Sequence, residues 1–249
     1  MVLEINNLTK TYGDKRALDG FSIKMTEGIY GLLGSNGAGK STLMGLLTGN
    51  VERETGEILL DGTDINKMGK EYRKQVGYMP QKQICYPEMT LLEFMGYMAA
   101  IKEVPKGERK KSINEIIAWL NLSDVGGKRL KTFSGGMLRR AILGQALLGN
   151  PSILILDEPT AGLDPGERIS LRNLIQEIAE NKIVLLATHI VSDIESTADR
   201  VILIQNGKML ACDSPEILIG ETAKKISETI YSGYVSLEDV YLEFFKAKE

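Results

Sequence analysis

The amino-acid sequence predicts an α/β protein: a mixed, mainly parallel sheet, an antiparallel β-subdomain at the N-terminal end, and an inserted helical subdomain. In the C-terminal half, short apolar runs alternate with a helical pattern, which is typical of parallel strands joined by crossover helices. Near the start of the chain, apolar and polar side chains alternate, as they do in half-buried strands. Between residues 82 and 150 the apolar spacing becomes helical.

Buried strands of the main sheet are expected at Ile29–Leu33, Ile153–Leu156, Ile183–Ala187 and Val201–Ile204. Helical spacing follows the first of these runs, at Ser41–Thr48, and separates the second from the third, at Pro165–Glu180. A strand, a helix and a strand in this order form a right-handed crossover between parallel strands.

The N-terminal β-subdomain is predicted from Leu3–Leu8 and Phe21–Met25, with turn signals at Gly13-Asp14 and Asp19-Gly20. Two further hairpins are indicated by two-residue turns. They are Glu57–Leu60 before Asp61-Gly62, and Val201–Ile204 with Lys208–Ala211 around Asn206-Gly207.

The chain is expected to form one domain, 1–249, in three parts. Residues 1–81 and 151–212 would form the α/β core with its β-subdomain, 82–150 the helical subdomain, and 213–249 a C-terminal helical extension. Helices of the insert are predicted at Thr90–Ala100, Lys111–Leu120 and Met137–Leu148. In the extension, Ser236 and Asp239 have the spacing of a capping box, and the apolar face that follows favours docking on the core over binding a partner: Leu237, Val240, Tyr241, Phe244 and Phe245.

Composition excludes several classes of protein. With 249 residues, 43% of them hydrophobic and 25% charged, the chain has the balance of a soluble globular protein. A net charge of -3 argues against nucleic acid as a partner. No apolar run approaches the ~18 residues that cross a bilayer, and no secretory signal opens the chain, so a cytoplasmic location is expected. Cys85 and Cys212 are too few for a disulfide framework or a zinc site and are expected to be reduced.

A phosphate-binding loop is predicted directly after the first apolar run. The residues Gly34-Ser35-Asn36-Gly37-Ala38-Gly39-Lys40-Ser41 match G-x-x-x-x-G-K-[ST] and open a helix. Such glycines let backbone N–H groups turn inward around an anion, which a flexible linker would not explain. Lys40 would neutralise β- and γ-phosphate oxygens, Ser41 would coordinate Mg²⁺, and Thr42 would donate to the α-phosphate. The core is therefore predicted to be a P-loop NTPase that binds a nucleoside triphosphate.

Two adjacent carboxylates follow Ile153–Leu156, at the end of a strand where ligand sites of parallel sheets lie. Asp157 is placed to hold Mg²⁺ through its water shell. Glu158 points in a different direction and is placed to orient the attacking water as a base. A simple turn cap explains the pair less well once the phosphate loop is present.

A second anion site is indicated by Phe133-Ser134-Gly135-Gly136-Met137. Ser134 is a residue type that caps helices, and the glycines behind it leave N–H groups open. Because a nucleotide has one γ-phosphate and the phosphate loop already holds one side of it, a second site favours a partner subunit. From the residues alone, an ordinary capped helix remains the alternative.

Over essentially the whole chain, these elements in this order resemble the nucleotide-binding subunit of an ATP-binding cassette (ABC) transporter. The resemblance implies that Tyr12 stacks on adenine and that Gln81 senses Mg²⁺ and the catalytic water. It also implies that Asp164 lies in a loop crossing a dimer interface and that His189, the one histidine of the sequence, contacts the γ-phosphate. The bound cofactors would be ATP and Mg²⁺, and hydrolysis would use Glu158, His189, Gln81 and Lys40.

The signature departs from the family's commonest Leu-Ser-Gly-Gly-Gln at Phe133 and Met137, while Ser134, Gly135 and Gly136 are intact. This Gly-Gly-Met signature resembles those of the bacterial drug, bacteriocin and lantibiotic exporter branch. The Met137 difference concerns the tuning of dimerisation more than hydrolysis.

The resemblance implies a head-to-tail homodimer that holds two ATP molecules and drives transport, in the export direction, through separate polytopic permease subunits. Residues Lys82–Glu93 are the candidates for permease docking, with core packing an equal alternative for 85–89. The chain would then lie on the inner face of the cell membrane. An ABC ATPase acting on ribosomes or DNA is disfavoured by the single cassette and the absence of basic excess, and a non-hydrolysing nucleotide binder by Glu158 and His189.

Overall fold

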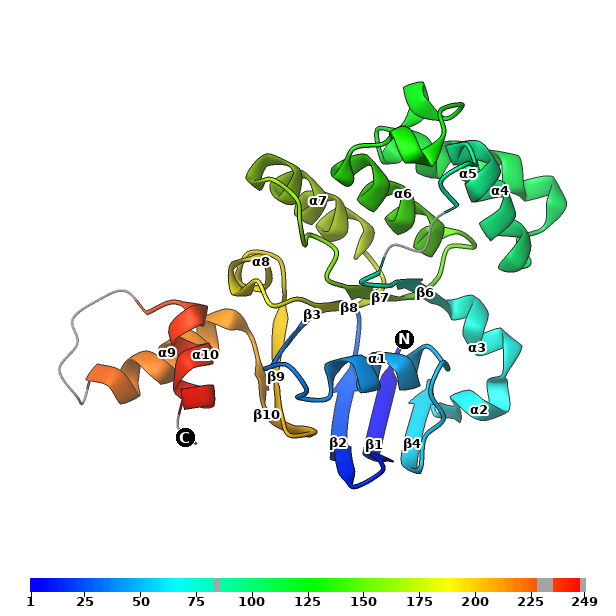
Figure 1. The fold of residues 1–249 in the computed structure, drawn as a ribbon. Helices are drawn as coiled ribbons and strands as arrows, with labels where there is room; N and C mark the ends of the chain where they lie inside the picture. Colours follow the sequence, from blue (N-terminus) through cyan, green and yellow to red (C-terminus); the bar gives the residue numbers. More distant parts are fainter. Residues whose placement is uncertain (83–85, 228–234, 247–249) are drawn as a thin grey trace.

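Two sheets organise the molecule. The computed structural model describes residues 1–82, 86–227 and 235–246. Within these ranges, a four-stranded sheet has the order β2-β1-β4-β5, and a six-stranded sheet has the order β10-β9-β3-β8-β7-β6 (Figure 1). The small sheet comprises β1 (Leu3–Tyr12), β2 (Lys15–Met25), β4 (Thr55–Leu60) and β5 (Thr63–Asp64). The large sheet comprises β3 (Gly28–Leu33), β6 (Val76–Met79), β7 (Ile153–Asp157), β8 (Ile183–Ala187), β9 (Arg200–Gln205) and β10 (Lys208–Asp213).

The large sheet is buried on both faces along its central strands, which explains their continuous apolar runs. Its neighbouring strands from β9 to β6 pair in parallel, and β10 pairs with β9 antiparallel. Because side chains alternate along a strand, Ile153 and Ile155 face the small sheet, while Leu154 and Leu156 face the opposite core. The predicted α/β class, the antiparallel N-terminal sheet and the mixed large sheet are confirmed.

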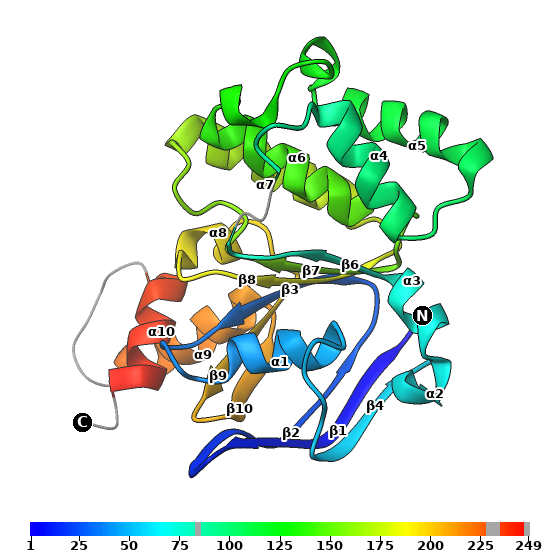
Figure 2. The same cartoon turned by 45° about the vertical axis from the view of Figure 1, so that its right-hand side comes forward.

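Helices cover the two faces of the large sheet differently. Helix α1 (Lys40–Leu47) lies between the two sheets, and its buried leucines share one core with both. On the other face lie α4 (Leu91–Ile101), α5 (Lys106–Trp119), α6 (Gly135–Leu147) and α7 (Pro165–Ile178), with α6 and α7 side by side (Figure 2). Helix α4 begins in a capping box between Thr90 and Glu93, which fixes where the insert turns helical.

Some local predictions are wrong or incomplete. The Asp19-Gly20 turn does not exist, because β1 and β2 form one long hairpin around Gly13-Asp14 and a register shift absorbs this pair inside β2. Strand β6 had not been anticipated. The short helices α2 (Ile65–Met68), α3 (Lys70–Gln75) and α8 (Val191–Glu195) had not been anticipated either.

The C-terminal segment packs on the core. Helix α10 (Leu237–Lys246) contacts α8 and α9 (Pro215–Ser227), and Leu237 and Val240 are fully buried. Its capping box is present, since the Ser236 N–H donates to Asp239 and the Asp239 N–H donates to the Ser236 hydroxyl. The Cys212 thiol is free, whereas Cys85 lies outside the described residues. Every helix in the described ranges is too short or too polar to span a bilayer.

Candidate nucleotide site

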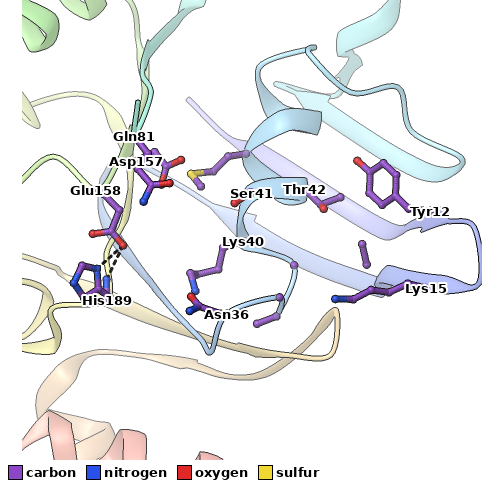
Figure 3. Close-up of a pocket in the computed structure, with 15 residues that line it drawn as sticks. Tyr12, Lys15, Asn36, Lys40, Ser41, Thr42, Gln81, Asp157, Glu158 and His189 are labelled. Carbon is purple, nitrogen blue, oxygen red and sulfur yellow. Dashed lines mark hydrogen bonds and ion pairs between the residues drawn. The ribbon is translucent and has the colours of Figure 1, made fainter. Parts of the chain in front are cut away.

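Four loops meet at one edge of the large sheet. Parallel pairing aligns Leu32 and Asp157 with Ala187, and Met79 with Leu156, so the ends of β3, β6, β7 and β8 lie together. A cavity of about 550 Å³ opens there (Figure 3). It is lined by Tyr12, Lys15, Ala17, Asn36, Gly37, Ala38, Gly39, Lys40, Ser41, Thr42, Met44, Gln81, Asp157, Glu158 and His189. The cavity therefore brings together most of the site residues predicted from the sequence.

The phosphate loop requires its glycines for two reasons. Gly39 precedes α1 with a φ of 114°, a region that side chains disfavour. A Cβ atom on Gly34 would lie 2.3 Å from the carbonyl oxygen of Ile204, so the loop can pass β9 only without a side chain there. Both glycines let the backbone wrap tightly enough to point its N–H groups inward.

The Lys40 side chain forms hydrogen bonds within its own loop. Its ammonium donates to the carbonyl oxygens of Gly34 and Ser35, the positions predicted to surround phosphate. Burial lowers the pKa of Lys40, while the carboxylates of Glu158 and Asp157 oppose that shift. An incoming phosphate would offer this half-buried cation a better partner than two carbonyl groups.

Asp157 is the last residue of β7, and its carboxylate lies beside that of Glu158. Burial raises its pKa, and the neighbouring charge of Glu158 raises it further, while Lys40 and Arg139 lower it. The backbone N–H of Gln81 also lowers the pKa of Asp157, since the end of β6 lies beside the end of β7. Two adjacent carboxylates in a partly buried position are more stable in ionised form when a cation binds beside them.

Glu158 is held in an unusual conformation by the next strand end. Its φ of +50° is rare for a residue with a side chain, and the residue is 7% exposed. One carboxylate oxygen accepts from the Thr188 hydroxyl at 3.0 Å. The other accepts from the backbone N–H of His189 at 3.0 Å and contacts its Nδ1 at 2.9 Å. Because a carboxylate only accepts, this contact assigns a proton to Nδ1 and leaves Nε2 for a ligand.

The opposite end of the cavity carries Tyr12 and Lys15, which pair across the β1–β2 turn (Figure 3). Tyr12 is 49% exposed, so its ring is available for stacking. Lys15 had not been predicted as a site residue. Its Nζ lies 3.1 Å from where a Cβ atom on Gly37 would be, beside the phosphate loop. In the sequence, Lys15 is recognisable only as the first residue after a two-residue turn. Its position beside the phosphate loop depends on how the hairpin bends.

The signature residues do not join this cavity. Ser134 caps α6 by accepting a hydrogen bond from the Met137 N–H at 3.2 Å, and Ser134 and Gly135 are exposed. Gly136 is buried against the carboxylate of Glu167. Asp164 caps α7 by accepting from the N–H of Glu167 at 2.9 Å. Within one chain, the helix end at 134–136 is thus separate from the phosphate loop.

The family model for the ABC transporter matches residues 18–161, more than half of the chain. This chain belongs to the ABC transporter family. It is 34% identical over 212 residues to the linearmycin resistance ATP-binding protein LnrL of Bacillus subtilis (strain 168), covering 84% of this chain and 68% of LnrL. The Nod factor export ATP-binding protein I of Rhizobium meliloti (strain 1021) is 34% identical over 235 residues, covering 94% of this chain and 70% of that protein. A solved ATP-binding subunit of an ABC transporter has 26% sequence identity and a TM-score of 0.81, covering 98% of this chain and 99% of its own.

This ABC ATPase is an ATP-binding subunit, and the residues of its cavity also fit Mg²⁺. Ser41, Gln81 and Asp157 present hydroxyl, amide and carboxylate oxygens, the hard donors that Mg²⁺ prefers, along the same cavity. No cluster of three or more His, Cys, Asp or Glu side chains with metal-ligand spacing exists in the described parts of the chain. Phosphate and water oxygens would therefore complete the coordination of the ion.

Proposed function

We propose that this ABC ATPase hydrolyses Mg·ATP in the cavity and uses the energy to drive export through separate polytopic membrane subunits. The observation that best supports this proposal is that the phosphate loop, Asp157, Glu158 and His189 all border one cavity, although they come from distant parts of the chain. A regulatory binder that does not hydrolyse would have no use for the buried, strained carboxylate of Glu158.

Each group along the cavity has a chemical role in this proposal. Tyr12 stacks on adenine, the N–H groups of the loop 34–41 surround the phosphates, Thr42 donates to the α-phosphate, and Lys40 neutralises the β- and γ-oxygens. Ser41, Gln81 and Asp157 hold Mg²⁺, which when bound offsets negative charge on the phosphates. Glu158 accepts a proton from the attacking water, and His189 contacts the γ-phosphate.

Dimerisation follows from the separation of the two anion sites. Ser134 and Gly135 are exposed at the start of α6 and lie outside the cavity of their own chain. A head-to-tail homodimer brings this helix end onto the γ-phosphate held by the other copy, with Asp164 in the loop between them. ATP then joins the copies, and hydrolysis releases them.

The permease would dock beside the start of α4. Residues 83–85 of the candidate segment Lys82–Glu93 lie outside the described residues. In the remainder, Tyr86 and Leu92 are 43% and 46% exposed, and Tyr86 meets exposed Tyr97 edge to face at 5.3 Å. Glu88 is held by Arg129 at 3.3 Å and Lys131 at 2.9 Å, which gives this apolar surface a fixed charged border. An apolar surface with a polar rim is typical of protein interfaces.

The export direction is supported by the names of two relatives, one concerned with linearmycin resistance and one with Nod factor export. The same proposal places the chain in the cytoplasm at the inner face of the membrane. It also divides the chain into the core (1–81 and 151–212), the helical subdomain (82–150) and the C-terminal extension (213–249). Action on ribosomes or nucleic acid is the competing function, and the net charge of -3 disfavours it.

Purification of the tagged full chain from gently solubilised membranes tests the transport proposal. We expect a polytopic membrane protein to co-purify, and we expect Leu92→Asp to lose it because a charge would be buried in the docking surface. Ile217→Asp, which places the same charge on an equally exposed apolar residue of α9, is the matched control. Recovery of ribosomal proteins or nucleic acid in place of a membrane protein would overturn the transport function while leaving the ATPase chemistry in place.

Lys15→Met is expected to weaken ATP binding by about 2- to 5-fold, the modest effect of losing a solvent-screened cation near a phosphate. Binding of adenosine should not change, because Lys15 is placed beside the phosphate loop and not over the ring of Tyr12. Isothermal titration with both ligands measures the difference. Lys24→Met, at the other end of β2, is the control, and an equal loss of adenosine binding would contradict the assignment.

A further inference from the structure

Arg139 is a buried cation with few partners. It lies in the second turn of α6 and is 7% exposed. One guanidinium nitrogen, Nη1, donates to the carbonyl oxygen of Gln81 at 3.4 Å, and Nη2 donates to that of Ala161 at 3.2 Å. Its Nε is buried without a hydrogen-bond partner. Among the described residues, no carboxylate lies within ion-pair distance of this guanidinium. Burial with so little compensation is unfavourable for folding, so a functional reason for the residue is indicated.

The two carbonyl groups belong to the two loops that build the catalytic site. Gln81 follows β6, and its backbone N–H lowers the pKa of the Asp157 carboxyl at the end of the neighbouring strand β7. Ala161 lies between Glu158 and Asp164, in the segment that leads from the strained carboxylate to the start of α7. Arg139 therefore joins, from α6, two segments that are 80 residues apart along the chain and adjacent in the site.

The C-terminal half of helix α6 is packed tightly against β6. The Gln145 side chain donates to the carbonyl oxygen of Tyr78 at 2.7 Å. A Cβ atom on Gly77 would lie 2.3 Å from the carbonyl oxygen of Ala146, so α6 approaches the strand as closely as a backbone allows. A displacement of α6 would therefore move β6 directly. The contact of Arg139 with Ala161 would also move the loop after β7.

We propose that Arg139 is a positioning residue that holds the Gln81 loop and the Glu158–Asp164 segment in fixed relation to α6, so that displacement of the helical insert reaches both loops together. Ser134, at the start of the same helix, is five residues away, which is about 7.5 Å along the axis. This inference rests on the proposed roles of Gln81 and Glu158. The planar guanidinium suits the task because its fork can bond two acceptors at once, which a lysine ammonium does less rigidly.

Electrostatics adds a second contribution. Burial lowers the pKa of Arg139, whereas the charges of Glu158 and Asp157 raise it. The catalytic carboxylates therefore help to keep the guanidinium charged, although none of them bonds it.

Arg139→Met tests the inference because it separates function from folding. We expect thermal stability to stay the same or rise, because a similar-sized apolar side chain replaces a poorly compensated buried charge. Turnover at saturating Mg·ATP should fall by about 10-fold or more, while the dissociation constant for ATP stays within about 2-fold. Arg139→Lys should restore turnover only in part. Arg109→Met is the matched control, since Arg109 is a half-buried arginine of the same insert that donates to a carbonyl oxygen, that of Val104.

Hydrogen exchange gives a readout that does not depend on activity. In Arg139→Met, amides of residues 159–163 should exchange faster, while those in the middle of α6 should not. Lower thermal stability with normal turnover would show a structural role and overturn the inference, as would weaker ATP binding at unchanged kcat. Normal turnover together with normal hydrogen exchange in Arg139→Met would also overturn the inference. If the unmodified chain failed to hydrolyse ATP, the proposed function would fall, and hydrogen exchange at 159–163 would still decide the role of Arg139.

Discussion

Replacement of Glu158 by glutamine is expected to reduce steady-state ATP turnover by about 10²- to 10⁴-fold, the usual contribution of a general base. Glutamine has nearly the same size, and its oxygen can still accept from the N–H of His189, but it cannot take a proton from water. The dissociation constant for Mg·ATP should stay within about 2-fold because the phosphate contacts are unchanged. Phosphate release and equilibrium binding, measured on the same preparation, separate the two effects.

Glu177→Gln is the control for this substitution. Glu177 is an exposed carboxylate on α7, and its replacement changes the charge by the same amount away from the cavity. Its turnover should match that of the unmodified chain. Normal turnover in Glu158→Gln would remove Glu158 from the role of base and would leave its strained backbone without a catalytic explanation.

Lys40→Met is expected to have the second large effect. ATP binding should weaken by about 10-fold or more, since a hydrogen-bonded charge on the phosphates is lost. Turnover should fall by about 10²- to 10³-fold, as it does when one preorganised donor to the transition state is removed. Stability without nucleotide should change little, because the ammonium is half-buried and bonds only carbonyl oxygens of its own loop.

Binding of a fluorescent ATP analogue and phosphate release are the measurements for Lys40→Met. The exposed Lys67→Met variant should behave like the unmodified chain in both. Tight ATP binding together with normal turnover in Lys40→Met would show that the phosphates bind elsewhere. Loss of binding accompanied by unfolding would be detected by a melting curve recorded without nucleotide.

The phosphate loop and the Asp157-Glu158 pair could be predicted from the sequence because their chemistry is local. Glycines at fixed spacing shape the loop, and a buried strand places the carboxylates at its end. The hydrogen bonds of Glu158 to Thr188 and His189 could not be predicted, since they depend on the register of β7 with β8. Residue spacing along the chain does not specify that register.

Strand β6 and the role of Arg139 were missed for one shared reason. Gly77 weakens the strand pattern of Val76–Met79, yet it is required because the backbone of α6 passes directly over it. That close packing also places Arg139 against the end of β6, where a charge in a helix would ordinarily be assigned to solvent. Lys15 was missed similarly, because its position beside Gly37 arises from the long β1–β2 hairpin.

We propose that the ATP site is complete only when a second copy contributes Ser134, Gly135 and Gly136. Light scattering of the Glu158→Gln chain with saturating Mg·ATP tests this most directly. We expect the mass of two chains with ATP and of one chain without it. Adding Ser134→Arg should keep the chain monomeric by blocking the anion site. A single-chain mass at saturating ATP, with ATP bound, would contradict it.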